Sequence, residues 1–176
     1  MFSVSIWLIP EKNQEEQLQK TINDLALTYN AFPFIPHITA YHLVEPPSLD
    51  KIKSVIEEQV RKTIPFSLNL EKLAHSTQFT KTLYAQYKIS PVLEALYNNL
   101  KRCFYPTNQY ELSPHLSLIY KNGMSDEDKS YELERLTVPD KLNIDRLMVI
   151  TRDGEHITKD ADVLDWKTES TLLLKS

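Results

Sequence analysis

Two short segments of the sequence each pair a histidine with a hydroxyl residue two positions later. They read Pro36-His37-Ile38-Thr39 and Pro114-His115-Leu116-Ser117. In a β-strand, side chains two positions apart project from the same face. Each imidazole would therefore share a face with its hydroxyl, while the aliphatic residue between them points to the core. One such segment is ordinary, but the duplication predicts a single site built from both.

Two histidines with two hydroxyl groups suit acid–base chemistry on a phosphate ester. Opening a cyclic phosphate requires a base to deprotonate water and an acid to protonate the departing alkoxide. Imidazole can do either job because its unperturbed pKa of about 6.5 keeps both protonation states available near neutral pH. Thr39 and Ser117 would donate hydrogen bonds to the non-bridging oxygens and stabilise the transition state. The segments therefore predict phosphoester hydrolysis that needs neither a metal ion nor another cofactor.

The composition excludes several other classes of protein. Gly123 and Gly154 are the only glycines, so the glycine-rich loops that cradle phosphates cannot be assembled. Cys103 is the only cysteine, which rules out an internal disulfide and a cysteine-based zinc site and favours the cytoplasm. The net charge of -4 provides no overall cationic field for long nucleic acids. We expect a small anionic ligand in a local pocket.

Strands and helices are expected to alternate along the chain. Strands are predicted over residues 2–9, 37–44, 66–73, 83–89, 113–120, 142–151 and 168–174. Helices are predicted over 11–29, 49–61 and 92–104, with a short fourth helix before Pro139, and Ser48, Ser90 and Ser125 are their expected N-caps. Twice a helix leads through proline into a strand that begins Pro-His. This pattern favours an α+β protein with two pseudo-symmetric lobes, forming one domain over residues 1–176.

The same segments resemble the 2H phosphoesterase superfamily, named for its two His-x-Thr/Ser motifs, and more closely its cyclic phosphodiesterase branch. Residues 34–39 and 113–120 match the two motifs, while 5–10 and 145–150 resemble the opening strand and a late strand. The resemblance implies a bilobal fold in which antiparallel sheets line a central cleft and helices lie outside. It also implies opening of a cyclic phosphate to a monoester. Substrates in this branch include ADP-ribose 1'',2''-cyclic phosphate and nucleoside 2',3'-cyclic phosphates.

The resemblance also implies roles for individual residues. It makes His115 the base and His37 the acid, with Thr39 and Ser117 as phosphate donors, although the near-symmetry of the site leaves the two histidine roles interchangeable.

Two aromatic residues enter the predicted substrate site through the resemblance alone. Tyr120 matches a motif tyrosine at the active site, and Trp7 matches an opening-strand tryptophan near the substrate. Strict alternation puts Tyr120 on the opposite face from His115, so its participation requires a bend or the end of the strand. The polar segment 77–80 corresponds to a family loop near the cleft and is a further predicted substrate contact.

The remaining histidines are not part of the predicted site. His42 is five residues beyond His37 and has the opposite strand parity, so it is expected to contact solvent or a loop. His75 and His156 fall in apparent loops and are expected at the surface.

Three functions remain open. The first is hydrolysis of a small cyclic phosphate, and the second is processing of RNA ends that carry 2',3'-cyclic phosphates or 2'-5' linkages. The third is nucleotide binding without catalysis. The acidic charge favours the small substrate over RNA, and the presence of both histidines and both hydroxyls favours an enzyme over a binder. We expect a monomer. We also expect no membrane partner, since the apolar residues 1–10 are too short to span a bilayer.

Overall fold

The computed structural model describes residues 2–104 and 110–175, which form an antiparallel sheet flanked by helices. The strands are β1 (Phe2–Pro10), β2 (Ile38–Val44), β3 (Phe66–His75), β4 (Leu83–Tyr87), β5 (His115–Ile119), β6 (Lys141–Asp153) and β7 (Lys167–Leu173). The helices are α1 (Lys12–Thr28), α2 (Leu49–Lys62), α3 (Pro91–Cys103) and α4 (Asp126–Leu133), with 3₁₀ helices η1 (Phe79–Lys81) and η2 (Asp160–Asp165). The α+β class and the order of the main elements are confirmed. The two 3₁₀ helices were not predicted.

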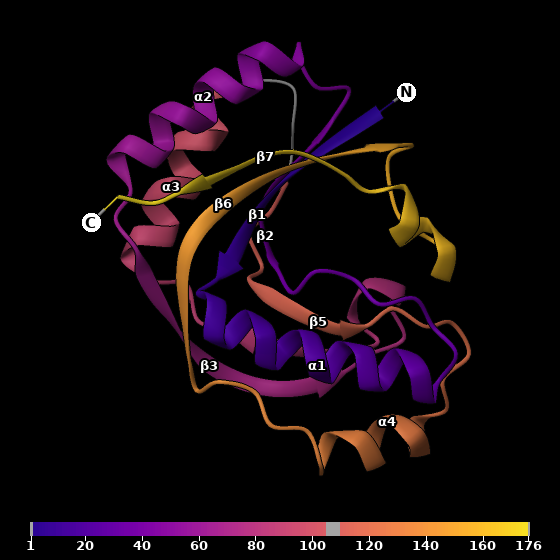
Figure 1. Cartoon of the computed structure of the whole chain (residues 1–176). Helices are drawn as coiled ribbons and strands as arrows, with labels where there is room; N and C mark the ends of the chain where they lie inside the picture. Colours follow the sequence, from indigo (N-terminus) through magenta and orange to yellow (C-terminus); the bar gives the residue numbers. More distant parts are fainter. Residues whose placement is uncertain (1, 105–109, 176) are drawn as a thin grey trace.

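The long strand β6 closes the sheet on itself. The strand order is β1-β2-β5-β4-β3-β6-β7, and β6 also pairs with β1. One edge of β6 pairs with β1, while its other edge pairs first with β3 and then with β7. The strands therefore form a strongly curved ring from which β7 extends (Figure 1).

The two motif strands belong to different halves of this ring. β2 pairs along most of its length with β1, and β5 pairs with β4. Among the described residues, β2 and β5 pair with each other at one position, where Ile38 faces Leu116. The two lobes expected from the sequence are therefore halves of one continuous sheet, joined at the residues that directly follow the two motif histidines.

Each motif strand is covered by a helix from the other half of the chain. α1 precedes β2 but packs against β5, and α3 precedes β5 but packs against β2. In Figure 1, α2 and α3 lie together on one side of the strands, with α1 and α4 on the other. The aliphatic motif residues Ile38 and Leu116 are fully buried in this packing, as the alternation predicts. This exchange of helices fixes the two halves relative to each other.

The three predicted serine N-caps are confirmed. The side chains of Ser48, Ser90 and Ser125 accept hydrogen bonds from backbone N–H groups of the first turns of α2, α3 and α4. These bonds satisfy donors that have no partner within the helix.

Candidate active site

A pocket of about 260 Å³ brings together five of the six predicted site residues. Its wall includes Trp7 from β1, Thr39 from β2, His115 from β5, and two residues next to strand ends, His37 and Tyr120. The sixth residue, Ser117, is 3% exposed and does not line this pocket.

The two motif histidines are held in the same way. Nδ1 of His37 lies 2.6 Å from the carbonyl oxygen of Ile35, and Nδ1 of His115 lies 2.7 Å from that of Ser113. Because a carbonyl can only accept, Nδ1 carries the hydrogen in both rings. Each neutral ring therefore keeps the lone pair on Nε2, and each protonated ring carries an acidic N–H there. In both motifs the accepting carbonyl precedes the proline, so the X-Pro-His sequence builds this support locally.

Burial keeps both histidines neutral in the free protein at neutral pH. It lowers the pKa of His37 to about 3, while the hydrogen bond to Ile35 opposes the shift and the charge of His115 adds to it. It lowers the pKa of His115 to about 4, opposed by the hydrogen bond to Ser113 and assisted by the charge of Lys81. A negatively charged ligand beside either ring would raise its pKa again. An acid and a base can therefore coexist in this pocket when an anion is bound.

Aromatic rings fix the plane of the His37 imidazole. Trp7 stacks on it with ring centroids 3.5 Å apart and an angle of 9° between the planes. Trp166 stands perpendicular to His37 at 5.6 Å, and Phe34 presents an edge at 6.1 Å. Trp7 is 2% exposed, so one of its faces is occupied by His37 and little of the ring is open to a ligand. Trp166 was missed in the sequence, because it follows η2 in a segment without a motif.

Ser117 interacts with both Thr80 and Tyr120. The Ser117 hydroxyl donates to the Thr80 carbonyl at 2.6 Å. The Ser117 side chain also interacts with the Tyr120 phenol, which opposes the effect of burial on the pKa of Tyr120. Burial raises the pKa of Tyr120 to about 12, so this phenol stays protonated. Tyr120 reaches the pocket because β5 ends at Ile119, which is the strand end that its participation required.

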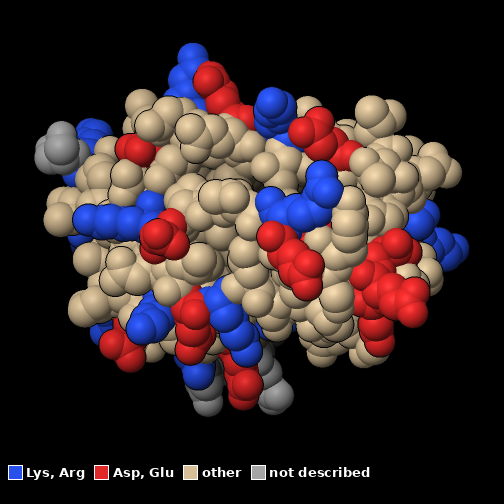
Figure 2. All heavy atoms as spheres, turned by 90° about the horizontal axis from the view of Figure 1, so that it is seen from below, with Lys and Arg blue, Asp and Glu red and all other residues tan. Residues whose placement is uncertain are grey.

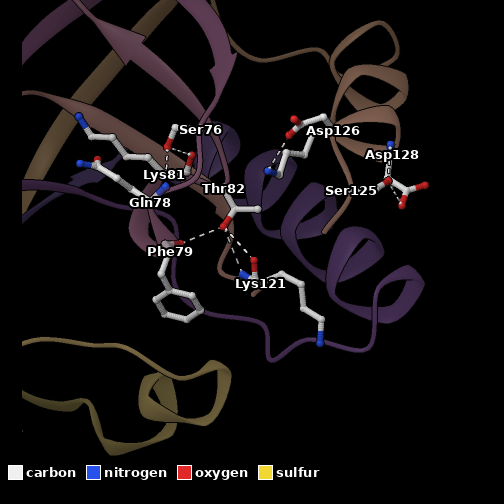
Figure 3. A network of polar contacts seen from close by, with 10 residues as sticks. Ser76, Gln78, Phe79, Lys81, Thr82, Lys121, Ser125, Asp126 and Asp128 are labelled. Atoms are coloured by element: carbon white, nitrogen blue, oxygen red, sulfur yellow. Dashed lines mark hydrogen bonds and ion pairs between the residues drawn. The ribbon is translucent and has the colours of Figure 1, made fainter. Parts of the chain in front are cut away.

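The polar segment before β4 is tied firmly to the end of β5 (Figure 3). The Thr82 hydroxyl lies 3.0 Å from the Phe79 carbonyl oxygen and 3.2 Å from that of Lys121. The Ser76 hydroxyl donates to the Lys81 carbonyl at 2.8 Å. These contacts hold η1 beside β5, and Thr80 lines the pocket. Of the predicted segment 77–80, Thr80 is the residue found in its wall.

His42 lies in the pocket wall because the sheet is irregular at this point. The register between β1 and β2 shifts after Ile6, so Ser5 faces His42 but Trp7 faces Thr39. Such a bulge adds one residue to a strand, so the side chains beyond it appear on the opposite face from the one that strict alternation predicts. His42 is then held between the Ser5 hydroxyl at 2.9 Å and the Glu155 carbonyl oxygen at 3.1 Å.

Two further residues of the pocket wall were left out of the predicted site. His156 is exposed, as expected, but its ring lies 5.8 Å from that of His42 and it lines the same pocket. Arg152 also lines it and was not singled out in the sequence. Alternation along β6 puts Arg152 on the same face as Met148 and Ile150, and this pattern could have been read from the sequence. Whether that face lines the pocket depends on how β6 pairs with distant strands.

Neither a metal-binding cluster nor a membrane-spanning helix is found among the described residues. Within residues 2–104 and 110–175, no group of three or more histidine, cysteine or acidic side chains could hold a metal ion. In the same part of the chain, none of the helices combines the length and the apolar character needed to cross a membrane. Metal independence itself stays a prediction.

Comparisons with known proteins match nearly the whole chain. A family model described as the 2'-5' RNA ligase superfamily matches residues 6–156. A cyclic phosphodiesterase of Arabidopsis thaliana is 21% identical over 173 residues, covering 93% of this chain and 91% of that protein. The crystal structure of TT0787 of Thermus thermophilus gives a TM-score of 0.65 at 11% identity, covering 98% of this chain and 97% of that chain. E. coli LigT complexed with 3'-AMP gives 0.59 at 13% identity, with 98% of both chains covered. The structural matches confirm the fold.

Proposed function

Because this chain belongs to the 2'-5' RNA ligase superfamily of 2H phosphoesterases, we propose that it hydrolyses a small cyclic phosphate ester to a phosphomonoester without a metal ion. One observation carries the proposal. His37 and His115 line the same pocket, and each has Nδ1 bound to a carbonyl, which leaves Nε2 for proton transfer. The relationship to the Arabidopsis cyclic phosphodiesterase supports the choice of a cyclic substrate.

The proposed reaction transfers one proton at each histidine. Nε2 of His115 accepts a proton from water as the water oxygen attacks phosphorus. Nε2–H of His37 donates a proton to the ester oxygen as its bond to phosphorus breaks, which gives a phosphomonoester and a free hydroxyl. The similar support of the two rings is also compatible with the reverse assignment. His37 must be protonated to act as the acid. The negative charge of the substrate favours this state, because it raises the pKa of a buried imidazole beside it.

The hydroxyl residues would stabilise the charge on the phosphoryl oxygens. Thr39 lines the pocket and can donate directly. Ser117 must first release the Thr80 carbonyl before it can donate to a phosphoryl oxygen. Trp7 contributes mainly through His37, because its stacked face orients the ring and favours the imidazolium form.

The surface charge favours a small substrate over long RNA. Figure 2 shows one face on which basic and acidic side chains are interspersed, without a continuous basic track. The net charge of -4 points in the same direction. RNA-end processing and non-catalytic nucleotide binding are the alternatives. The single domain over residues 1–176, the monomeric state and the cytoplasmic location remain predictions.

The proposal is tested by assaying hydrolysis in excess chelator. The substrates are ADP-ribose 1'',2''-cyclic phosphate, the nucleoside 2',3'-cyclic phosphates and a short RNA with a cyclic phosphate end. Turnover of the small compounds that survives chelation is the expected result, and product identity shows which ester bond breaks. Turnover of the RNA alone would move the function to end processing. Absence of turnover with all substrates would contradict the proposal.

A further inference from the structure

The pocket extends well beyond the two motif histidines. Trp7, Ser5 and Ser3 alternate along β1, and all three line the pocket. Ser5 faces His42 across the sheet, and Ser3 faces Arg152. Two residues of a strand span about 7 Å, so the row with Ser3 lies about 13 Å along the strand from the row with Trp7. A single phosphate at the motif histidines would leave this far end of the pocket without a ligand group.

Arg152 occupies that far end, and its side chain is 11% exposed. Its buried Nε atom has no hydrogen-bond partner within residues 2–104 and 110–175. The nearest carboxylate oxygen, Oδ2 of Asp162, lies 3.6 Å from Nη2, which is beyond hydrogen-bond length. That oxygen already accepts from the backbone N–H groups of Thr158 and Lys159. The guanidinium therefore donates no hydrogen bond to the residues that the structure describes, although it carries five donors.

A buried cation without hydrogen-bond acceptors is costly unless a ligand supplies them. The guanidinium fork matches the oxygens of a phosphoryl group, and such bonds are among the strong ones in proteins. Ser3 is 3% exposed and its hydroxyl has no partner among the described residues, so it offers a neighbouring donor. Asp162 and Glu155 are the nearby acidic groups. Asp162 is held by backbone donors, and Glu155 is exposed, so solvent screens its charge.

We infer that Arg152 and Ser3 form a second anion subsite, which binds a further phosphoryl group of the substrate. This inference rests on the proposed function, because the reacting phosphate is placed at the motif histidines. It narrows the substrate class to cyclic phosphates of nucleotides that also carry a 5'-phosphoryl or 5'-diphosphate group. The sugar or nucleoside between the two anions would span the middle row of Ser5 and His42.

Equilibrium binding tests the subsite independently of turnover. The probes are adenosine 3'-monophosphate and adenosine 3',5'-bisphosphate, measured by calorimetry in chelator. The wild-type protein should bind the bisphosphate on the order of tenfold to a hundredfold more tightly. Arg152→Gln should abolish this preference and leave the affinity for the monophosphate unchanged. If that variant does not fold, Arg152→Lys should lose most of the preference, because it keeps the charge but not the planar fork.

Two control variants separate anion binding from structural effects. Asp162→Asn removes the ion pair between Arg152 and the segment after β6 but keeps the guanidinium, so the preference should persist. Arg61→Gln removes the same positive charge as Arg152→Gln, but at an exposed position on α2. This variant should also keep the preference for the bisphosphate. Equal affinities in the wild type, or equal losses in Arg152→Gln and Asp162→Asn, would overturn the subsite. If the protein hydrolyses cyclic phosphates but binds the bisphosphate no more tightly than the monophosphate, only the subsite is contradicted. If it prefers the bisphosphate but hydrolyses none of the substrates, only the proposed function is contradicted.

Discussion

The indole of Trp7 and the imidazole of His37 lie nearly parallel, with ring centroids 3.5 Å apart. The stack ties the first strand of the chain to the motif that precedes β2. It covers one face of the imidazole, and the edge contact from Trp166 limits rotation of the ring further. In the proposed mechanism, the precision of proton transfer at His37 therefore depends on residues that need not contact the substrate.

Trp7→Leu should lower kcat by about tenfold to a hundredfold with little change in KM, because a misplaced imidazole impairs proton transfer more than binding. Trp7→Phe keeps an aromatic ring and should retain most of the activity. Steady-state kinetics on a nucleoside 2',3'-cyclic phosphate checks both variants. A higher KM at unchanged kcat would show that Trp7 contacts the substrate instead.

His37→Gln and His115→Gln should each lower kcat by about 10² to 10⁴, the usual size of a contribution from general acid–base catalysis. Combining the two changes should cost less than the product of the single effects, since the residues act in one reaction step. His75→Gln is the matched control, because His75 ends β3 outside the pocket. Folded variants with unchanged rates would contradict the mechanism.

Acidic pH should destabilise the fold through the buried histidines. Burial lowers the pKa of His37 to about 3, whereas an unfolded histidine titrates near 6.5. Between these values the unfolded state binds a proton that the folded state does not, so the free energy of unfolding falls as the pH decreases. By pH 5 the loss from His37 is about 2 kcal/mol relative to pH 8. Urea unfolding at pH 8, 6.5 and 5 should show a shallower pH dependence for His37→Gln than for the wild type, and equal dependences would refute the prediction.

An anion in the pocket should bind together with a proton. Because both motif histidines are neutral at pH 7, and a nearby negative charge raises the pKa of an imidazole, sulfate should bind more tightly as the pH falls from 7 to 5. The affinity should rise by up to about tenfold per pH unit for each proton taken up. Sulfate is suitable because it does not titrate in this range. Sulfate affinities measured by calorimetry that do not change with pH would contradict this prediction. So would a pH dependence that is as steep in His37→Gln and His115→Gln as in the wild type.

Local sequence patterns determined the elements and the core of the predicted site. The alternation of polar and apolar residues identified β2 and β5 as strands and placed Ile38 and Leu116 in the core. Serines before helical patterns identified the N-caps, since a hydroxyl there satisfies free backbone donors. The repeated motif indicated that His37 and His115 act together. The strand and N-cap inferences depend on interactions within a few residues, which a sequence displays directly, whereas the joint site was inferred from the repetition of the motif.

The tertiary structure alone decided which side chains share the pocket. The register shift after Ile6 places His42 beside Ser5, and the ring closure through β6 brings Arg152 to the same wall. Trp166 reaches His37 from a segment more than a hundred residues later in the chain. Bulges, registers and such contacts are selected by the packing energy of the whole sheet, because each strand could satisfy its local pattern in several alignments. The sequence by itself therefore specified the two histidines, while the folded chain specified what surrounds them.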